Sequence, residues 1–447
     1  MMQKKRKHRS EDEFMMYALD KVKQQPIILG LILLYILPPI GMAWFVCRAV
    51  KMLYDQFAAK KALPTDLISI FLAMTVLASL GSILISGRFF DLLSTAMLIG
   101  YFGIYLFLLR RPEQLRLRQF AWITIWGGVY IFFSEKLLVL IPDDSLIGTA
   151  VSFMTGHFLF GYKGIPRLYG STFNPNYACY LLILAVACLS VELLRAIQLK
   201  KKMTIFLSLM LMPLLDFAIY ETGSRAGFVI MILLHLLFVY KLSKRLFVPA
   251  ALFTVVGAKV LYNWMPRSSG TETSMAKRLE IWGNSWHIFQ QNPFFGATNF
   301  GFLRVYSANN GSMIPHAHDL FLSILSSSGI FCALFFIAIL LIGGYQLFKV
   351  QKISMNTKSN YSATLFLFAL PTIILYGILD FTLSSPQVMI MVLILLSYWT
   401  RFTAQMNQMT RLHRTLSEAL LQRRTLFRKR HAHEPATLQP AKDVSSR

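Results

Sequence analysis

Long apolar runs recur along nearly the whole chain, and they limit its fold more than any other feature. Each run has about 17–25 residues, enough to cross a hydrocarbon core of roughly 30 Å. The composition agrees, with 55% hydrophobic residues and 36 Phe among 447 residues and a mean hydropathy of +0.53. The runs are too long and too uniformly apolar for the strands of a membrane barrel. We therefore expect an all-α, polytopic transmembrane helical bundle of about 11–12 spans. The expected spans cover residues 27–48, 65–87, 89–109, 119–141, 176–197, 203–221, 224–241, 245–265, 319–348, 362–380 and 385–402.

The formal net charge is +24, and its distribution indicates topology. Lys and Arg gather in the short connections 110–118, 195–202 and 349–358 and at the two ends of the chain. Membrane proteins keep such loops in the cytoplasm. The connections 142–175 and 266–315 then face outward. We read the charge as a topological signal and expect no nucleic-acid partner.

The ends of the chain frame a central membrane domain. We expect a basic N-terminal segment over residues 1–26, a membrane domain over 27–402 and a basic cytoplasmic tail over 403–447. About eleven spans with an inside C-terminus would leave the basic N-terminus outside, against the charge rule. Pro38 and Pro39 interrupt the first span, so a broken or re-entrant helix there is the alternative. Such a helix would return the N-terminus to the cytoplasmic side.

The longest outward loop, 266–317, is expected to contain an amphipathic helix. Apolar residues recur there at spacings of three and four: Met275, Leu279, Trp282, Trp286 and Phe289. Such a stripe with two Trp residues suits a helix that lies at headgroup depth. By helical geometry, Arg278 falls beside this stripe and should point toward the membrane domain, whereas Lys277 should point to water.

His316 and His318 close this loop. Residues two apart on an extended segment share a face, and an imidazole with an ordinary pKa of about 6.5 is suited to abstract a proton near neutral pH. The alternative is a pair of exposed loop histidines, and the same triplet recurs at 431–433. No third His or Cys stands nearby at a metal-binding spacing, so we expect no metal site. The four cysteines lie in apolar segments and form no disulfide framework.

Two further polar stretches directly precede apolar segments, on the side of the membrane that is expected to face outward. Arg225 follows Thr222-Gly223-Ser224, where its guanidinium could bind a phosphate bidentately or serve only as an interfacial anchor. The stretch from Arg167 to Asn176 precedes another span, and Asn174 or Asn176 could cap that helix.

In chain order, these stretches resemble motifs of the O-antigen ligase and polymerase superfamily of bacterial membrane glycosyltransferases. The resemblance covers roughly residues 70–400. The stretches are 167–176, Gly223-Ser224-Arg225-Ala226-Gly227, Arg278-Leu279-Glu280-Ile281-Trp282, Asn292-Pro293-Phe294-Phe295-Gly296 and His316-Ala317-His318-Asp319-Leu320.

The resemblance implies a metal-independent, inverting glycosyltransferase without cofactors, in the inner membrane of a bacterium. The donor would be a polyprenyl pyrophosphate-linked saccharide, and the acceptor a glycan, a lipid or a protein. Ligase and polymerase remain equally open.

The resemblance also assigns roles to residues. Arg225 and Arg278, with Arg167, would bind the diphosphate, Asn176 would lie at the same site, and His318 would be the base. The superfamily more often has Asn where this chain has Asp319, so His316 remains an alternative base. A role of Asp319 in orienting His318 is a further alternative. A transporter or flippase of polysaccharide or a lipid-linked solute is the rival reading and would carry inverted repeats.

Overall fold

The computed structural model describes residues 25–138, 140–141, 145–155, 167–356 and 360–408. Every regular element in these ranges is a helix, which confirms the all-α prediction. Seven helices in the described ranges are long and apolar enough to cross a membrane, and a bent pair makes an eighth candidate. The other expected spans correspond to shorter or more polar helices.

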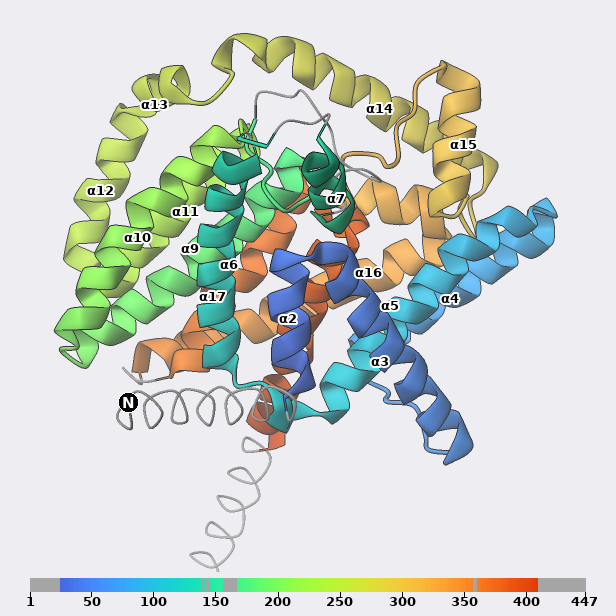
Figure 1. The fold of residues 1–447 in the computed structure, drawn as a ribbon, viewed down its shortest axis with the longest axis horizontal. Coiled ribbons are helices and arrows are strands. Elements are labelled where there is room, and N and C mark those ends of the chain that lie inside the picture. The colour runs from blue at the N-terminus through green and yellow to red at the C-terminus, as the bar shows by residue number, and fades with distance from the viewer. Residues whose placement is uncertain (1–24, 139, 142–144, 156–166, 357–359, 409–447) are drawn as a thin grey trace, which may run out of the picture. The chain divides into compact units, whose positions relative to one another are not determined.

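Figure 1 shows the helices in order along the chain. They are α2 (Pro26–Ile36), α3 (Pro38–Ala58), α4 (Leu67–Ser86), α5 (Leu92–Arg110), α6 (Leu117–Leu138), α7 (Leu146–Thr155), α9 (Pro175–Gln198), α10 (Lys202–Glu221), α11 (Arg225–Leu242), α12 (Lys244–Val256), α13 (Ala258–Trp264), α14 (Thr271–Gln291), α15 (Asn299–Asn310), α16 (Leu320–Asn356), α17 (Tyr361–Gly377) and a last helix, Pro386–Gln408. Short 3-10 turns lie at Phe89–Asp91, Pro112–Gln114, Ser268–Gly270 and Thr382–Ser384.

The chain divides into two compact units, Met1–Trp399 and Thr400–Arg447. The site described below lies entirely in the first unit. The expected boundaries after residues 26 and 402 stay predictions.

Helix α9 is the central helix of the first unit. It packs against α6, α10, α11 and α17, and every residue from Ala178 to Leu189 is at most 1% exposed. A helix that is apolar all round is suited to such a position. Its first turn, beginning at Pro175, is therefore held rigidly among its neighbours.

The first expected span is in fact a hairpin of α2 and α3. The indole of Trp44 donates a hydrogen bond to the carbonyl of Pro26 (2.9 Å), so α3 folds back on α2. The two helices meet closely because Gly41 has no side chain: a Cβ there would lie 2.4 Å from the backbone nitrogen of Leu34. The break at Leu37-Pro38 agrees with the alternative of a broken helix, and the side of the membrane on which the N-terminus lies stays a prediction.

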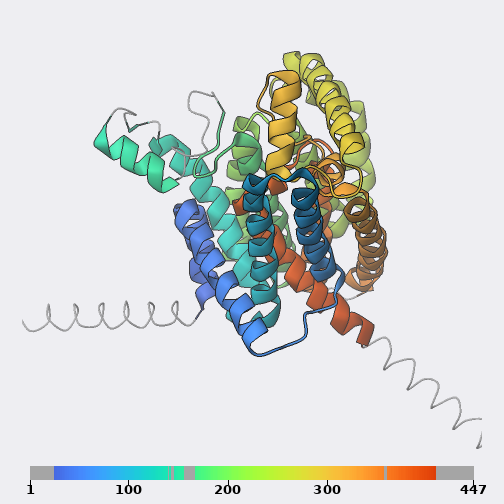
Figure 2. The same cartoon turned by 90° about the vertical axis from the view of Figure 1, so that its right-hand side faces the viewer.

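The connections of the first unit lie at two opposite ends of its helices. Arg110 donates to the carbonyl of Ala62, and Arg118 at the start of α6 forms an ion pair with Glu192 near the end of α9. These contacts bring the connections 59–66, 111–116 and 199–201 together, and we call this the basic end. The other end, which holds the connections 87–91, 167–174, 222–224 and 265–319, we call the site end (Figure 2).

The segment 265–319 is built on a bent helix pair. Helices α12 and α13 differ in direction by 64° at Gly257. Side chains such as Val248, Leu252 and Phe253 on α12 are exposed, as expected of a surface that faces lipid. From α13 the chain crosses the site end as α14 and then α15 (Figure 1).

The motif Asn292-Pro293-Phe294-Phe295-Gly296 fills a break in α16. At Gly329 the backbone has a φ of +80°, and a Cβ there would lie 2.1 Å from the carbonyl oxygen of Phe294. The amide of Ile330 donates to the carbonyl of Pro293 (2.9 Å), and the amide of Ala297 donates to that of Ser326 (2.8 Å). The loop thus forms hydrogen bonds with backbone groups that the broken helix leaves without a helical partner. These bonds hold α14 and α15 against α16.

Charges near the spans have partners at close range. Lys136 pairs with Glu221 (2.8 Å), His235 pairs with Asp216 (3.0 Å), and Asp91 pairs with Arg304 of α15 (2.9 Å). The last pair docks α15 on the hairpin of α4 and α5. Asp380 pairs with His318, which belongs to the site.

Candidate functional site

The turn between α10 and α11 places a cation at a helix start. Gly223 has a φ of +66°, and a Cβ there would lie 3.1 Å from Nε of Arg167. Ser224 caps α11 by accepting from the amide of Gly227, and its hydroxyl also contacts that of Tyr376 (2.9 Å). Gly227 lets α11 approach α9, because a Cβ there would meet Cys179. Gly223, Ser224 and Gly227 therefore each have a structural role, and Arg225 lies at the site end.

Arg167 lies beside this turn and is held from two sides. Its Nε donates to the carbonyl of Thr222 (2.5 Å), and its Nη2 donates to Oδ1 of Asn176 (2.9 Å). Burial and the neighbouring cation of Arg267 lower the pKa of Arg167. Arg267 was not singled out from the sequence. Its φ is +55°, an unusual conformation for a residue with a side chain.

Helix α14 turns Arg278 toward the membrane domain, as predicted, but only Trp282 and Phe289 of its apolar stripe are half-buried. Its buried positions are Ile281, Ser285 and Ile288. Met275, Leu279 and Trp286 of the predicted stripe are exposed. Apolar periodicity does not distinguish a core from lipid, so the stripe identified a helix at an interface but not which face meets the protein.

Lys277 is exposed, as expected, but it does not face bulk water alone. Lys277 and Arg278 both line one cavity of about 520 Å³ at the site end. The cavity is wide enough to be reached from two adjacent positions on α14. Its other lining residues come from several parts of the fold and are Arg167, Asn176, Gly223, Ser224, Arg225, Arg267, Gly270, Thr273, Ser274, Ile281, Ile314 and His318.

The charge of this cavity is strongly one-sided. Five cationic side chains and no Asp or Glu occur among its described lining residues. The ion pairs in the described part of the chain involve none of these five cations. Like charges gathered without carboxylate partners favour a bound anion, and guanidinium groups match the geometry of phosphate oxygens.

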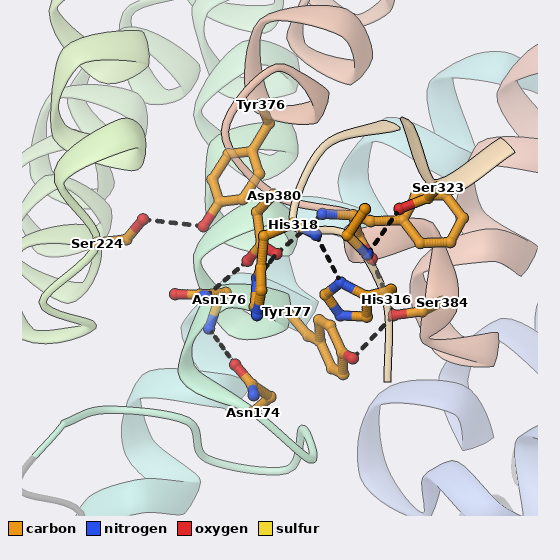
Figure 3. A network of polar contacts seen from close by, with 12 residues as sticks. Asn174, Asn176, Tyr177, Ser224, His316, His318, Ser323, Tyr376, Asp380 and Ser384 are labelled. Atoms are coloured by element: carbon orange, nitrogen blue, oxygen red, sulfur yellow. Dashed lines mark hydrogen bonds and ion pairs between the residues drawn. The ribbon is translucent and has the colours of Figure 1, made fainter. Parts of the chain in front are cut away.

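His318 stands at the edge of the cavity and contacts a buried carboxylate. Its Nδ1 lies 2.8 Å from Oδ1 of Asp380, with side-chain exposures of 28% and 4% (Figure 3). His318 has a φ of +52°, which costs conformational energy and is typical of functional positions. Because Nδ1 faces a carboxylate, that nitrogen carries the proton and Nε2 is left as the acceptor.

Asp380 is ionised although it is buried. Burial alone would raise its pKa, but the hydrogen bond and charge of His318, with smaller contributions from His316 and the Phe381 amide, lower it to about 2. Asp380 also accepts from Nδ2 of Asn176 (2.6 Å) and from the amide of Phe381 (2.9 Å). Such a carboxylate can orient an imidazole and stabilise its protonated form.

The two histidines differ in their surroundings. His316 is buried, and its Nδ1 accepts from the amide of His318 (3.3 Å). Burial, together with the charge of His318, lowers the pKa of His316 to about 4. His316 is absent from the described cavity lining, whereas His318 is part of it.

Asp319 does not contact His318 through any hydrogen bond found here. Its Oδ1 accepts from the amide of Leu322 (2.7 Å) at the start of α16, and burial raises its pKa. It therefore caps the helix. The carboxylate bonded to His318 is Asp380, 62 residues later in the chain.

His316, His318 and Asp380 also form a possible metal-ligand set. One ligand atom from each lies within 4.8 Å of the others. Two ligands on one tetrahedral zinc, each at about 2.1 Å, would lie roughly 3.4 Å apart. The distance of 2.8 Å between His318 and Asp380 is that of a hydrogen bond. The arrangement fits a His–Asp pair better than a metal centre, and the expectation of a metal-free site stays a prediction.

The fold and the site define a class: a polytopic helical membrane protein with a cationic cavity and a His–Asp pair at one end of its helices. Residues 205–337 match the family model of the O-antigen ligases (Wzy_C), and this match confirms the resemblance to the O-antigen ligase superfamily. The matched region contains Arg225, Arg278 and His318 but neither Asn176 nor Asp380. A search among curated proteins found no match to the chain.

Proposed function

We propose that this protein transfers a saccharide from a polyprenyl pyrophosphate carrier to an acceptor hydroxyl at the outer face of the bacterial inner membrane. The observation that carries the proposal is the position of His318, which lines the same cavity as five cations while its Nδ1 contacts Asp380. One site then provides both the cations that would bind a diphosphate leaving group and the base that would accept a proton.

The proposed reaction is a direct displacement. The acceptor oxygen forms a bond to the anomeric carbon as the bond from that carbon to the phosphate oxygen breaks. Nε2 of His318 takes the hydroxyl proton, and the electron pair of the broken bond leaves with the diphosphate. Arg225, Arg278 and Arg167 stabilise the charge that develops there. Attack opposite the leaving group inverts the anomeric configuration, and no cofactor takes part.

The acceptor is a glycan, a lipid or a protein, and both a ligase and a polymerase fit the site. The rival proposal is a flippase of a lipid-linked saccharide. A flippase would need the cations but would have no use for a base fixed by a buried carboxylate, which favours the transferase.

The test is transfer by purified protein in liposomes that contain a lipid-linked oligosaccharide and an acceptor glycolipid. We expect a product of higher mass and release of polyprenyl pyrophosphate. His318→Ala should bind the donor but form no product. Transfer at the wild-type rate by His318→Ala would refute the proposed base, and movement of intact donor across the bilayer without product would favour the flippase.

A further inference from the structure

A chain of hydrogen bonds connects an arginine of the cavity to the proposed base. Nη2 of Arg167 donates to Oδ1 of Asn176 (2.9 Å), and Nδ2 of Asn176 donates to Oδ2 of Asp380 (2.6 Å). Oδ1 of Asp380 then meets Nδ1 of His318 (2.8 Å). The close-up in Figure 3 shows Asn176, on the first turn of α9, beside Asp380.

The amide of Asn176 has one favourable orientation in this chain. A flipped amide would turn its NH₂ group toward the guanidinium of Arg167 and its oxygen toward the carboxylate of Asp380. Both contacts would be repulsive, so the network assigns the orientation. The backbone is fixed as well, because the amide of Asn176 donates to Oδ1 of Asn174 (2.8 Å), the capping residue of α9.

Both polar ends of the Asn176 side chain are therefore occupied by protein groups. Asn176 also lines the cavity, so its expected contact with substrate stays a prediction. Its dipole points its positive end at Asp380 and its negative end at Arg167, and aligned hydrogen bonds of this kind polarise one another.

We propose that Asn176 is a positioning residue that couples the leaving-group site to the base. It keeps Oδ2 of Asp380 occupied, so that Oδ1 remains on His318, and it transmits the charge of Arg167 to the His–Asp pair. The inference rests on the proposed function, because it assigns coupling between two parts of that same site.

The decisive variant is Asn176→Asp, which keeps the size of the side chain. It places a second carboxylate at the 2.6 Å contact with Asp380. Two carboxylates at that distance cannot both stay ionised easily, and as pH falls the pair takes up a proton that restores a hydrogen bond. We expect the ratio of variant to wild-type kcat to rise about tenfold or more between about pH 8 and pH 6. A thermal unfolding temperature close to that of the wild type identifies the variant as folded.

Asn174→Ala is the matched control, two residues away on the same turn. It removes the cap of α9 and should lower the thermal unfolding temperature. Its kcat ratio to wild type should not depend on pH, because Asn174 is not part of the chain of bonds to Asp380. A role of Asn176 in helix stability alone would give both variants the same flat ratio and would overturn the inference.

A second, independent measurement is the non-additivity of two substitutions in their effects on kcat. It tests the role of Asn176 even if the Asn176→Asp variant does not accumulate. Arg167→Lys and Asp380→Asn should act non-additively on kcat in the wild-type background, and additively in the Asn176→Ala background. Equal coupling in both backgrounds would overturn the inference. A wild-type protein that binds donor and transfers nothing would instead overturn the proposed function, so the two failures are distinguishable.

Discussion

Nδ1 of His318 lies 2.8 Å from Oδ1 of Asp380, although 62 residues separate them in the chain. The contact joins the end of the segment 265–319 to the turn that follows α17. It fixes which ring nitrogen of His318 is free to accept a proton, and it explains how a buried carboxylate stays ionised. The pair is the structural basis of the first prediction.

Asp380→Asn should reduce kcat about a hundredfold or more while donor binding changes little, because an amide cannot stabilise the imidazolium. The measurement is single-turnover transfer with purified protein. Asp319→Asn is the matched control: Asn caps a helix as well as Asp does, so this variant should retain nearly full activity. Equal losses in the two variants would contradict the assignment of Asp380.

Arg278→Lys and Arg225→Lys should each lose most of the transfer activity, since a planar guanidinium aimed at a leaving diphosphate is worth about 3 kcal/mol or roughly a hundredfold in rate. Lys277→Ala should weaken donor binding by a smaller factor that shrinks at high salt, because Lys277 is an exposed cation on the same cavity. A completely silent Lys277→Ala would support the discarded expectation that it faces water alone.

Acid should destabilise the protein in two separate pH windows. His316 has its pKa lowered from 6.5 to about 4, so its contribution to stability is present above about pH 6.5 and is lost as pH falls through about 4. Asp380 has its pKa lowered from 3.8 to about 2, so its contribution is lost only between those two values. Thermal unfolding in detergent should show the first loss in wild type and a smaller one in His316→Asn. An unchanged slope in that variant would place the first loss elsewhere.

Chelation of divalent ions should leave transfer unchanged, because the proposed displacement uses only protein cations. Added Zn²⁺ should inhibit, since His316, His318 and Asp380 can converge on one ion and a metal-bound His318 is no longer a base. Inhibition should weaken in His316→Asn. Activity that is lost with a chelator and restored by a divalent ion would refute the metal-free mechanism.

Labelling of single cysteines in intact cells should place the site end outside. In a background with Cys47→Ser, Ser312→Cys should react with an impermeant maleimide, and Glu113→Cys should react only after permeabilisation. Ser312 and Glu113 are both exposed and belong to opposite ends of the helices. The reverse pattern would invert the topology and remove the proposed outer-face reaction.

The sequence predicted the helical fold and singled out several residues that line the cavity, but not the contacts that join them. Apolar length predicted the spans, and local motifs identified Arg225, Arg278 and His318. No sequence pattern assigns a partner to Asp380, because that partner depends on how α17 packs beside the segment 265–319. Arg267 was missed because it lies in no motif.

The apolar periodicity of a helix also did not predict which groups surround it. The helical projection placed Lys277 in water because it assumed that only a narrow face of α14 meets the protein. The cavity is wider than that face and is lined by both Lys277 and Arg278. The apolar stripe of α14 was expected at headgroup depth, and its periodicity did not indicate that Ile281, Ser285 and Ile288 form the buried face. The prolines after Leu37 indicated a break, yet only the contact between Trp44 and Pro26 shows that the break is a hairpin.

The contact between Asn176 and Asp380 spans 204 residues, and this separation bears on how the protein is made. The ribosome delivers Asn176 and Arg225 long before His318 and Asp380. A nascent chain that has inserted only its early helices therefore has Arg225 but lacks the His–Asp pair. The site becomes complete only when synthesis has passed Asp380, so under the proposed function we expect unfinished chains in the membrane to transfer no glycan.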